Sequence, residues 1–429
     1  MSHPTPRHPE QVYTYGTPQL KFGPGASAEI GYDLSRTGAR RALIVTDAGI
    51  AASGGPAQVA DQMREFDIET VIFDGSRVEP TDASLDDAIA FAREHGPFDA
   101  YVAVGGGSSI DTAKAINLLM TNDGALLDYV NAPVGGGKAP SVPLKPLIAV
   151  PTTTGTGSES TTICVLDVLD QHVKSGISHA WLRPTMAVID PDLTMSQPAM
   201  VTACAGMDIL CHALESYTAR PYTSYEHKQA HERVPYCGSN PIADMWSEKA
   251  LQLMAGSFRR AVADGSDRSA RGDMAMAATF AGMGFGNAGV HLPHANAYPI
   301  AGQVKGFHPE GYPGDEAMVP HGMAVSLTAP AAFRLTYAAA PERHLRAAQL
   351  LDAQAPRTSD PANQLPSILV RLFQDIGIPN GLSGVGFTDT DLDALTEGTL
   401  KQERLLTTAP LPIDRAAVRR VLADSMSLW

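Results

Sequence analysis

Residues 99–119 read DAYVAVGGGSSIDTAKAINLL, an apolar run that ends in three glycines and continues into a second apolar segment. This order is typical of a buried strand, a glycine turn and a helix. Similar strand and helix patterns flank it at 40–49, 69–75, 82–96, 146–159 and 186–193. Because strands alternate with helices, the pattern predicts a parallel sheet that is covered by helices on both faces.

The chain changes character after Pro198, where the runs of β-branched residues stop. Two segments, 220–241 and 302–320, look like irregular insertions. We therefore expect two domains, an α/β domain over residues 1–197 and an all-α domain over residues 198–429. Segments rich in Ala, Leu and Met predict the helices of the second domain at 199–219, 243–263, 269–285, 323–353, 364–376 and 414–427.

The composition narrows the classes of function. The 429 residues carry a formal net charge of -14 and no Lys/Arg cluster, which argues against a nucleic-acid-binding surface. Four cysteines without a CxxC pair, and an N-terminal segment without the apolar core of a secretory signal, predict a reduced, cytoplasmic protein. Residues 274–304 lack charged side chains, which suits a membrane span or a buried helix that runs into a site loop. Gly, Asn, His and Pro interrupt this segment and favour the second interpretation.

Two turns are candidates for binding phosphate groups. Gly105-Gly106-Gly107-Ser108 follows one predicted strand and opens a helix, and the Gly/Thr-rich turn 152–158 follows another strand. Backbone N–H groups of such turns face anions, although a single glycine turn is equally well explained as structural. Two turns at the carboxyl ends of strands in one sheet favour a nucleotide site. Asp47, at the end of the strand predicted in 40–49, suits either a ribose contact or a turn before Gly49.

The stretch CAGMDILCHALESY (204–217) places Asp208 and His212 four residues apart in an apolar helix. These side chains share one helix face, and a buried carboxylate needs a compensating cation or strong donors. A divalent metal fits this pair, and so does an ion pair between the two residues alone. Three further histidines, His291, His294 and His321, favour the metal, although a lone histidine is more often a hydrogen-bonded core residue. Imidazole and carboxylate ligands suit Fe(II), Zn or another first-row metal.

GGGSSIDTAK, PTTTGTGSE, GMDILCHALESY and the later PHG, in this order, resemble the iron-containing (group III) alcohol dehydrogenases over nearly the whole chain. The resemblance implies a dehydroquinate synthase-like fold, with an N-terminal NAD-binding α/β domain and a C-terminal helical, metal-binding domain. It implies one bound metal ion, Fe(II) as the family's name indicates. The ligands would be Asp208, His212, His294 and His321. His291 is the alternative to His294, which we prefer because it opens the segment HANAYP.

The same resemblance implies the cofactor contacts. Asp47 would bind the adenine ribose and favour NAD over NADP, and Lys174 would approach the nicotinamide ribose. The remaining cofactor-binding residues would be Gly106, Gly107 and Ser108 at the pyrophosphate, and Thr152, Thr153 and Thr156 of the second turn. The chain departs from the family at Ala295, usually glycine, and at Tyr298, where many members have histidine. Tyr298 would either donate a proton in catalysis or pack.

One subgroup fits best, the hydroxyacid-oxoacid transhydrogenases, on stretches such as FAGMGFGNAGVHLPHANAYPI and the insertion that ends in GSNPI. These enzymes oxidise 4-hydroxybutyrate to succinate semialdehyde and reduce 2-oxoglutarate to D-2-hydroxyglutarate through bound NAD. The alternatives are an NAD-dependent dehydrogenase of the same family that releases NADH and a dehydroquinate-synthase-like lyase. Both substrates of this reaction are anions, but the basic residues of the insertions (Arg233, Lys305 and His308) suit a solvated loop better than a substrate site. The family also implies a homo-oligomer, a dimer or larger.

Overall fold

The computed structural model describes residues 8–171, 173–312, 314 and 316–429, which form two compact units. The first unit spans Thr17–Ser196, and the second contains Gln197–Trp429 together with residues 8–16. Residues 8–16 therefore pack with the helical unit, not with the α/β unit that the sequence predicted for them. Asn287 explains this placement, because its side chain accepts a hydrogen bond from the Gly16 N–H at 3.0 Å and donates one to the Gly16 carbonyl at 3.0 Å.

The α/β unit is built on a six-stranded sheet in the order β1-β8-β5-β4-β2-β3, in which every neighbouring pair is parallel. β4 lies inside the sheet and is buried along its whole length, as the run DAYVAV predicted. The strands are β1 (Gln19–Phe22), β2 (Arg41–Val45), β3 (Glu69–Phe73), β4 (Ala100–Gly105), β5 (Leu147–Pro151) and β8 (Met186–Ile189).

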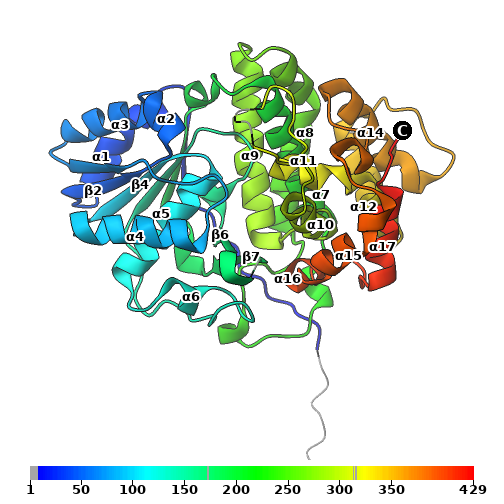
Figure 1. Cartoon of the computed structure of the whole chain (residues 1–429), viewed down its shortest axis with the longest axis horizontal. Helices are drawn as coiled ribbons and strands as arrows, with labels where there is room; N and C mark the ends of the chain where they lie inside the picture. Colours follow the sequence, from blue (N-terminus) through cyan, green and yellow to red (C-terminus); the bar gives the residue numbers. More distant parts are fainter. Residues whose placement is uncertain (1–7, 172, 313, 315) are drawn as a thin grey trace, which may run out of the picture. The chain divides into compact units, whose positions relative to one another are not determined.

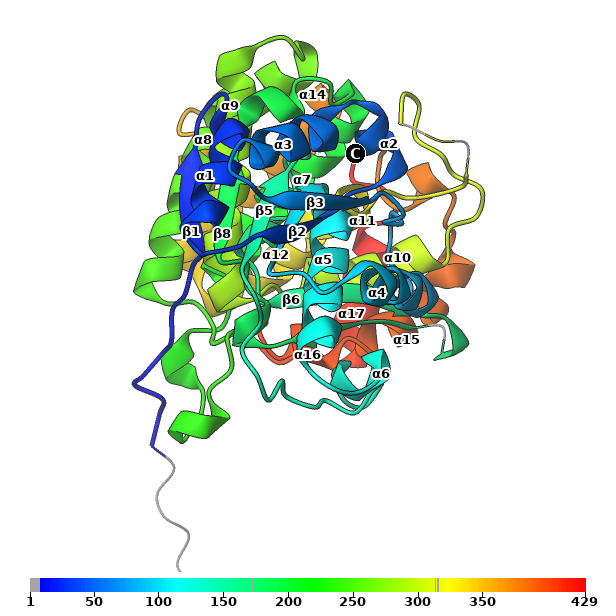
Figure 2. The same cartoon turned by 90° about the vertical axis from the view of Figure 1, so that its left-hand side faces the viewer.

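Helices cover both faces of this sheet (Figures 1 and 2). On one face, Ile30 and Met63 pack with Ile44 and Val102 of the strands, and on the other, Leu85 and Ile116 pack with residues such as Leu43. Alternate strand residues thus enter different cores, which confirms the predicted parallel sheet between two helical layers. The helices are α1 (Ile30–Ser35), α2 (Ala48–Ala52), α3 (Gly55–Arg64), α4 (Asp82–His95), α5 (Gly107–Thr121) and α6 (Leu126–Tyr129).

A separate antiparallel hairpin, β6 (Ile163–Val168) and β7 (Val173–Ser178), belongs to the same unit and was missed in the sequence. Only β6 has a marked apolar pattern, because β7 contains Lys174, Ser175 and Gly176 among its six residues. β7 is defined by pairing with β6, and that pairing is not visible in the composition of the segment.

The second unit is helical and has one large apolar core. The prediction of a helix over 323–353 is wrong, because the helical segment is interrupted after Leu327 and again before Pro341. Pro330 and Pro341 stand in the first turns of the next helices, where the missing N–H of proline is tolerated. The helices are α7 (Ala199–Thr218), α8 (Pro241–Ala263), α9 (Arg268–Ala288), α10 (Leu292–Gly302), α11 (His321–Leu327), α12 (Ala329–Thr336), α13 (Pro341–Leu351), α14 (Gln364–Ile376), α15 (Leu392–Leu400), α16 (Glu403–Leu406) and α17 (Arg415–Asp424).

The uncharged segment 274–304 is divided between α9 and α10 by Gly289, whose φ of 96° a residue with a side chain rarely adopts. In the part of the chain that the structure describes, no helix has both the length and the apolarity needed to cross a membrane. This segment instead forms two buried helices with a sharp break between them, and the break leads into the candidate metal site.

Candidate metal and nucleotide sites

The first element of the candidate metal site is α7, which is buried over most of its length. Asp208 and His212 lie one turn apart on it and are 3% and 5% exposed. The Nε2 atom of His212 is 3.6 Å from the Oδ1 atom of Asp208. The spacing read from the sequence therefore places both side chains on one buried helix face, as predicted.

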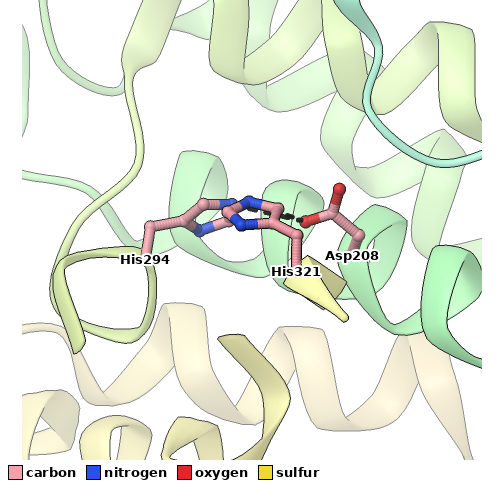
Figure 3. Close-up of side chains that lie close together, drawn as sticks. All are labelled: Asp208, His294 and His321. Carbon is pink, nitrogen blue, oxygen red and sulfur yellow. Dashed lines mark ion pairs between the residues drawn. The ribbon is translucent and has the colours of Figure 1, made fainter. Parts of the chain in front are cut away.

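Two other segments bring histidines to Asp208. His294 comes from the first turns of α10, and His321 is the first residue of α11 (Figure 3). Their Nε2 atoms lie 3.4 and 3.8 Å from Asp208 Oδ1. One ligand atom from each of the three residues lies within 4.8 Å of the other two.

Gly322 explains how α11 comes this close to α7. A Cβ atom at this position would lie 2.9 Å from the Cβ atom of Asp208 and nearer still to the Cys204 carbonyl oxygen. Only a residue without a side chain allows this approach, so the glycine of the PHG motif sets the position of the histidine before it.

The donor set fits a divalent metal. Asp208 Oδ1 and His294 Nε2 are buried, and neither has a hydrogen-bond partner among the described residues. Buried polar atoms that make no hydrogen bond are rare and unfavourable in folded proteins, and these two face each other at 3.4 Å. A cation between them would satisfy both, and one carboxylate with imidazoles suits a first-row transition metal.

His212, the fourth predicted ligand, lies beside this three-residue group and not within it. Its ring stacks on Phe285, with centroids 3.9 Å apart, and its centroid is 4.6 Å from that of His294. The residue is adjacent to the cluster, and its role as a ligand stays a prediction.

His291 and His294 have different surroundings. His291 is fully buried, and its Nε2 atom is 3.1 Å from the Thr218 hydroxyl oxygen, outside the group of candidate ligands. His294 instead directs Nε2 toward Asp208 and Nδ1 toward Glu215. Glu215 is a residue that the sequence analysis missed, although it stands seven residues after Asp208 on the same helix face.

The electrostatics of the cluster follow from burial and from charge neighbours. Burial opposes ionisation of Asp208, but the surrounding histidines outweigh it and hold the pKa of this carboxyl below its usual range. Burial lowers the pKa of His212 to about 3, so this imidazole is neutral at physiological pH. Burial also disfavours a charge on His294, but Glu215 and Asp208 prevail and raise its pKa to about 9. Asp208 is thus ionised, and a metal would displace a proton from His294.

Tyr298 lies on the same helix as His294. Its ring centroid is 6.2 Å from that of His321, and the ring packs against a small apolar cluster that includes Phe285 and Leu405. This position suits both roles considered from the sequence, a proton donor near the metal cluster and a packing residue.

The α/β unit brings its two predicted phosphate turns together. A Cβ atom at Gly106 would lie 3.3 Å from the Thr153 hydroxyl oxygen, and one at Gly107 would lie 2.7 Å from that of Thr156. Gly106 is the N-cap residue of α5, and no side chain caps the first turn of this 15-residue helix. The N–H groups at the start of the helix can therefore bind an anion. Ser108 belongs to this first turn, and Thr152 donates its N–H to the Gly105 carbonyl at 3.0 Å.

Lys114 fastens the second turn to α5. Its side chain is fully buried, and its ammonium donates to the carbonyl and hydroxyl oxygens of Ser158, both at 2.9 Å. It also donates to the Ile163 carbonyl at 2.7 Å and lies 3.3 Å from a carboxylate oxygen of Asp111. A buried charge is tolerated only with such partners, so this ammonium holds the turn and the helix in one arrangement.

The two remaining cofactor candidates already have contacts within the chain. One oxygen of Asp47 accepts the Ile50 N–H at 3.0 Å and caps α2, as the turn interpretation expected. Its other oxygen would be 3.6 Å from a Cβ atom at Gly105, so it faces the glycine turn. Lys174 forms ion pairs with Glu79 and, at 3.0 Å, with Asp167.

The basic residues of the insertions also have contacts within the chain, and the preference against them as substrate ligands stays a prediction. Arg233 binds Glu10 at 2.6 Å, and Lys305 binds Asp391 at 2.5 Å. Both ring nitrogens of His308 lie within hydrogen-bonding distance of backbone carbonyls, those of Glu316 and Tyr312.

Comparison with known proteins shows which protein family has a similar sequence. The family profile described as iron-containing alcohol dehydrogenase matches residues 17–191, and that of the C-terminal part of the Fe-containing alcohol dehydrogenase family matches residues 230–426. A mitochondrial hydroxyacid-oxoacid transhydrogenase from Xenopus tropicalis is 44% identical over 430 residues, which cover 99% of this chain and 93% of that protein.

Solved structures with a similar fold lead to the same family. The crystal structure of a 1,3-propanediol oxidoreductase is 32% identical, with a TM-score of 0.84, and covers 97% of this chain and 100% of its own. The NAD⁺ complex of sulfoacetaldehyde reductase from Bifidobacterium kashiwanohense is 26% identical, with a TM-score of 0.81, and covers 97% and 99% of the two chains. These neighbours confirm the predicted two-part fold, and the NAD⁺ complex supports a nicotinamide cofactor. The iron-containing family profile and the cluster of Asp208, His294 and His321 support a divalent metal.

The comparison also corrects one prediction. The cytoplasmic location expected from the sequence is wrong, because the similar curated proteins from Xenopus and human are named as mitochondrial. The expectation relied on reduced cysteines and on the composition of the N-terminal segment. Neither feature distinguishes one reducing compartment from another.

Proposed function

This chain belongs to the iron-containing alcohol dehydrogenase family, and we propose that it is a hydroxyacid-oxoacid transhydrogenase that retains its NAD. The proposed reaction oxidises 4-hydroxybutyrate to succinate semialdehyde and reduces 2-oxoglutarate to D-2-hydroxyglutarate. The observation that carries the proposal is the cluster of Asp208, His294 and His321, in which two buried atoms without a hydrogen bond face each other, in a chain 44% identical to a transhydrogenase.

We propose that Asp208, His212, His294 and His321 hold a divalent metal, and that the metal is Fe(II). When bound, such an ion acts as a Lewis acid that lowers the pKa of a coordinated hydroxyl group. Asp208 supplies the negative charge of the site, and the neutral His212 supplies a ring nitrogen without further charge. We propose that a substrate approaches the cluster beside His321, whose side chain is 33% exposed whereas that of Asp208 is 4% exposed.

The redox step balances without an external oxidant. In the proposed reaction, 4-hydroxybutyrate would lose a hydride from C4 to the nicotinamide and a proton from its hydroxyl group. 2-Oxoglutarate would then take the hydride at C2 and a proton at the new hydroxyl. We propose that Tyr298, near His321, exchanges this proton. The cofactor performs the redox chemistry, and the protein orients it and excludes competing reactions.

We propose that NAD binds at the two adjoining turns of the α/β unit, with the pyrophosphate at Gly106, Gly107 and Ser108. Asp47 would accept hydrogen bonds from the adenine ribose and repel the 2′-phosphate of NADP. The Oδ1 atom of Asp47 accepts the Ile50 N–H and caps α2, and this hydrogen bond fixes the carboxylate for the ribose contact. Thr152, Thr153, Thr156 and Lys174 complete the proposed set.

A product assay tests this function. The purified protein is loaded with Fe(II) under anaerobic conditions and mixed with 4-hydroxybutyrate and 2-oxoglutarate, without free nicotinamide. Chiral chromatography then measures D-2-hydroxyglutarate. We expect many turnovers per protein molecule. If product forms only after NAD is added, and NADH accumulates without an oxoacid, the chain is a dehydrogenase that releases its cofactor and the proposal is wrong.

A further inference from the structure

Three N–H groups of the segment 291–294 converge on one buried carboxylate. Glu215, which is 0% exposed, accepts the backbone N–H of His291 at 2.8 Å and that of His294 at 3.2 Å, both at Oε1. Its other oxygen, Oε2, makes a short contact with Nδ1 of the His294 ring. Both oxygens of this carboxylate are therefore engaged by the segment that carries a candidate metal ligand.

Glu215 lies on the same helix face as two candidate ligands. Asp208, His212 and Glu215 stand at positions i, i+4 and i+7 of α7, and residues with this spacing share one helix face. Asp208 faces the cluster directly, whereas Glu215 reaches it only through His294. One helix thus carries two candidate ligands and a group that holds a third ligand from another helix.

The contact with Nδ1 decides which ring nitrogen is available. A carboxylate is an acceptor, so Nδ1 must carry the hydrogen, and Nε2 is left with a lone pair once the ring is neutral. Nε2 is the atom that lies 3.4 Å from Asp208 Oδ1 and has no hydrogen-bond partner among the described residues. The tautomer that Glu215 selects is therefore the one that a metal at this point requires.

We propose that Glu215 is a positioning residue for the metal, which fixes the ring orientation and tautomer of His294 and the backbone that carries it. The inference rests on the proposed metal site. Glu215 does not position the ring of His291 in the same way. The Nδ1 atom of that ring is 4.0 Å from Glu215, and its Nε2 atom faces Thr218.

Glutamine is the informative replacement. It has the size of glutamate but only one acceptor oxygen, and three N–H groups need two acceptors here. In Glu215→Gln, the amide NH₂ group must face either the backbone N–H groups or Nδ1, and the second choice imposes the wrong tautomer. Glu248→Gln is the matched control. Glu248 also accepts two side-chain hydrogen bonds in the helical unit, from Tyr217 and Arg346, but it contacts no candidate ligand.

The test measures metal binding, not turnover. The affinity for Zn²⁺ is measured by competition with a chromophoric chelator, and the absorption spectrum of bound Co²⁺ reports the coordination geometry. Loss of an outer partner of a metal-bound histidine weakens metal binding by about 10- to 100-fold. We expect that loss and an altered Co²⁺ spectrum in Glu215→Gln, with Glu248→Gln indistinguishable from the wild type.

A double-mutant cycle separates positioning from general destabilisation. If Glu215 acts through His294, Glu215→Gln weakens Zn²⁺ binding no further in a His294→Ala background. Equal affinities and spectra for Glu215→Gln and the wild type, or losses that add fully in the cycle, would overturn the inference. If Glu215→Gln does not fold, Glu215→Asp replaces it, because the shorter carboxylate cannot reach both the backbone and Nδ1. A wild-type protein that binds neither metal would refute the proposed metal site itself, and the inference with it.

Discussion

Replacing Gly322 with alanine should disrupt the metal cluster without changing a ligand. The added Cβ atom would lie 2.9 Å from the carbonyl carbon of Cys204 and 2.9 Å from the Cβ atom of Asp208, and closer still to the Cys204 carbonyl oxygen. Ordinary contacts begin near 3.4 Å. Two of the obstacles are backbone atoms of α7, so α11 itself must move away by more than 0.5 Å, the difference between 3.4 and 2.9 Å.

This displacement is large for a metal site. Metal–ligand distances are held within about 0.2 Å, so the movement removes His321, the residue before Gly322, from productive geometry. We expect the affinity for Zn²⁺ to fall by at least about tenfold, as when a ligand loses its supporting partner. Overpacking in a filled core also lowers the free energy of unfolding by about 1–3 kcal/mol.

The assay combines chelator competition for Zn²⁺ with urea unfolding of the metal-free protein. Gly256→Ala is the control, because Gly256 lies in α8 and a Cβ atom there would have no neighbour within 4 Å. That change should leave metal affinity unaltered and raise the free energy of unfolding by up to about 1 kcal/mol. A Gly322→Ala protein with wild-type Zn²⁺ affinity would refute the argument that this glycine sets the position of His321.

Three further predictions concern single groups. His294→Ala should weaken metal binding so far that dialysis removes the metal, although the remaining ligands keep an affinity that chelator competition can measure, whereas His291→Gln should retain the metal after dialysis; the reverse result would exchange the two assignments. Since the pKa of His294 is raised to about 9 in the metal-free fold, above its ordinary 6.5, its stabilising contribution is complete below pH 6.5 and is lost as the pH rises through 9. Urea titrations of the metal-free protein should show this loss, and calorimetry in buffers of different ionisation enthalpy should show proton release on metal binding below pH 9; uptake of Zn²⁺ without proton release would contradict the assignment. Lys114→Met leaves Asp111 buried without its cation and should lower the free energy of unfolding by about 3–5 kcal/mol and weaken NAD binding, measured by urea unfolding and by fluorescence titration; unchanged values would show that the buried ammonium does not hold the turn.

Local signals explain which parts of the fold could be predicted. The stretch 99–119 contains its strand, glycine turn and helix within one contiguous pattern, and β4 and α5 begin and end within a few residues of it. The breaks in 323–353 had a local signal too, Pro330 and Pro341, but the apolar content of the segment concealed it. β7 had no signal of its own, because its strand character comes from pairing with β6.

The candidate site follows the same division. The pairing of Asp208 with His212 depends on helix spacing alone and was visible in the sequence. The difference between His291 and His294 depends on which ring reaches Asp208 and which reaches Thr218, a property of tertiary packing. Glu215 was missed because an acidic residue on a helix resembles a solvated charge until the segment 291–294, 76 or more positions away, packs onto it.

The central claim is that hydride passes between two acids on a cofactor that does not leave the protein. The most direct measurement uses 4-hydroxybutyrate labelled with deuterium at C4, unlabelled 2-oxoglutarate, Fe(II)-loaded protein and a large excess of free unlabelled NADH. Mass spectrometry then reads the deuterium at C2 of the 2-hydroxyglutarate formed. A retained cofactor predicts nearly complete transfer of one deuterium despite the free pool. Product in which the label is diluted by that pool would show that NADH is released and exchanged, and would contradict the account.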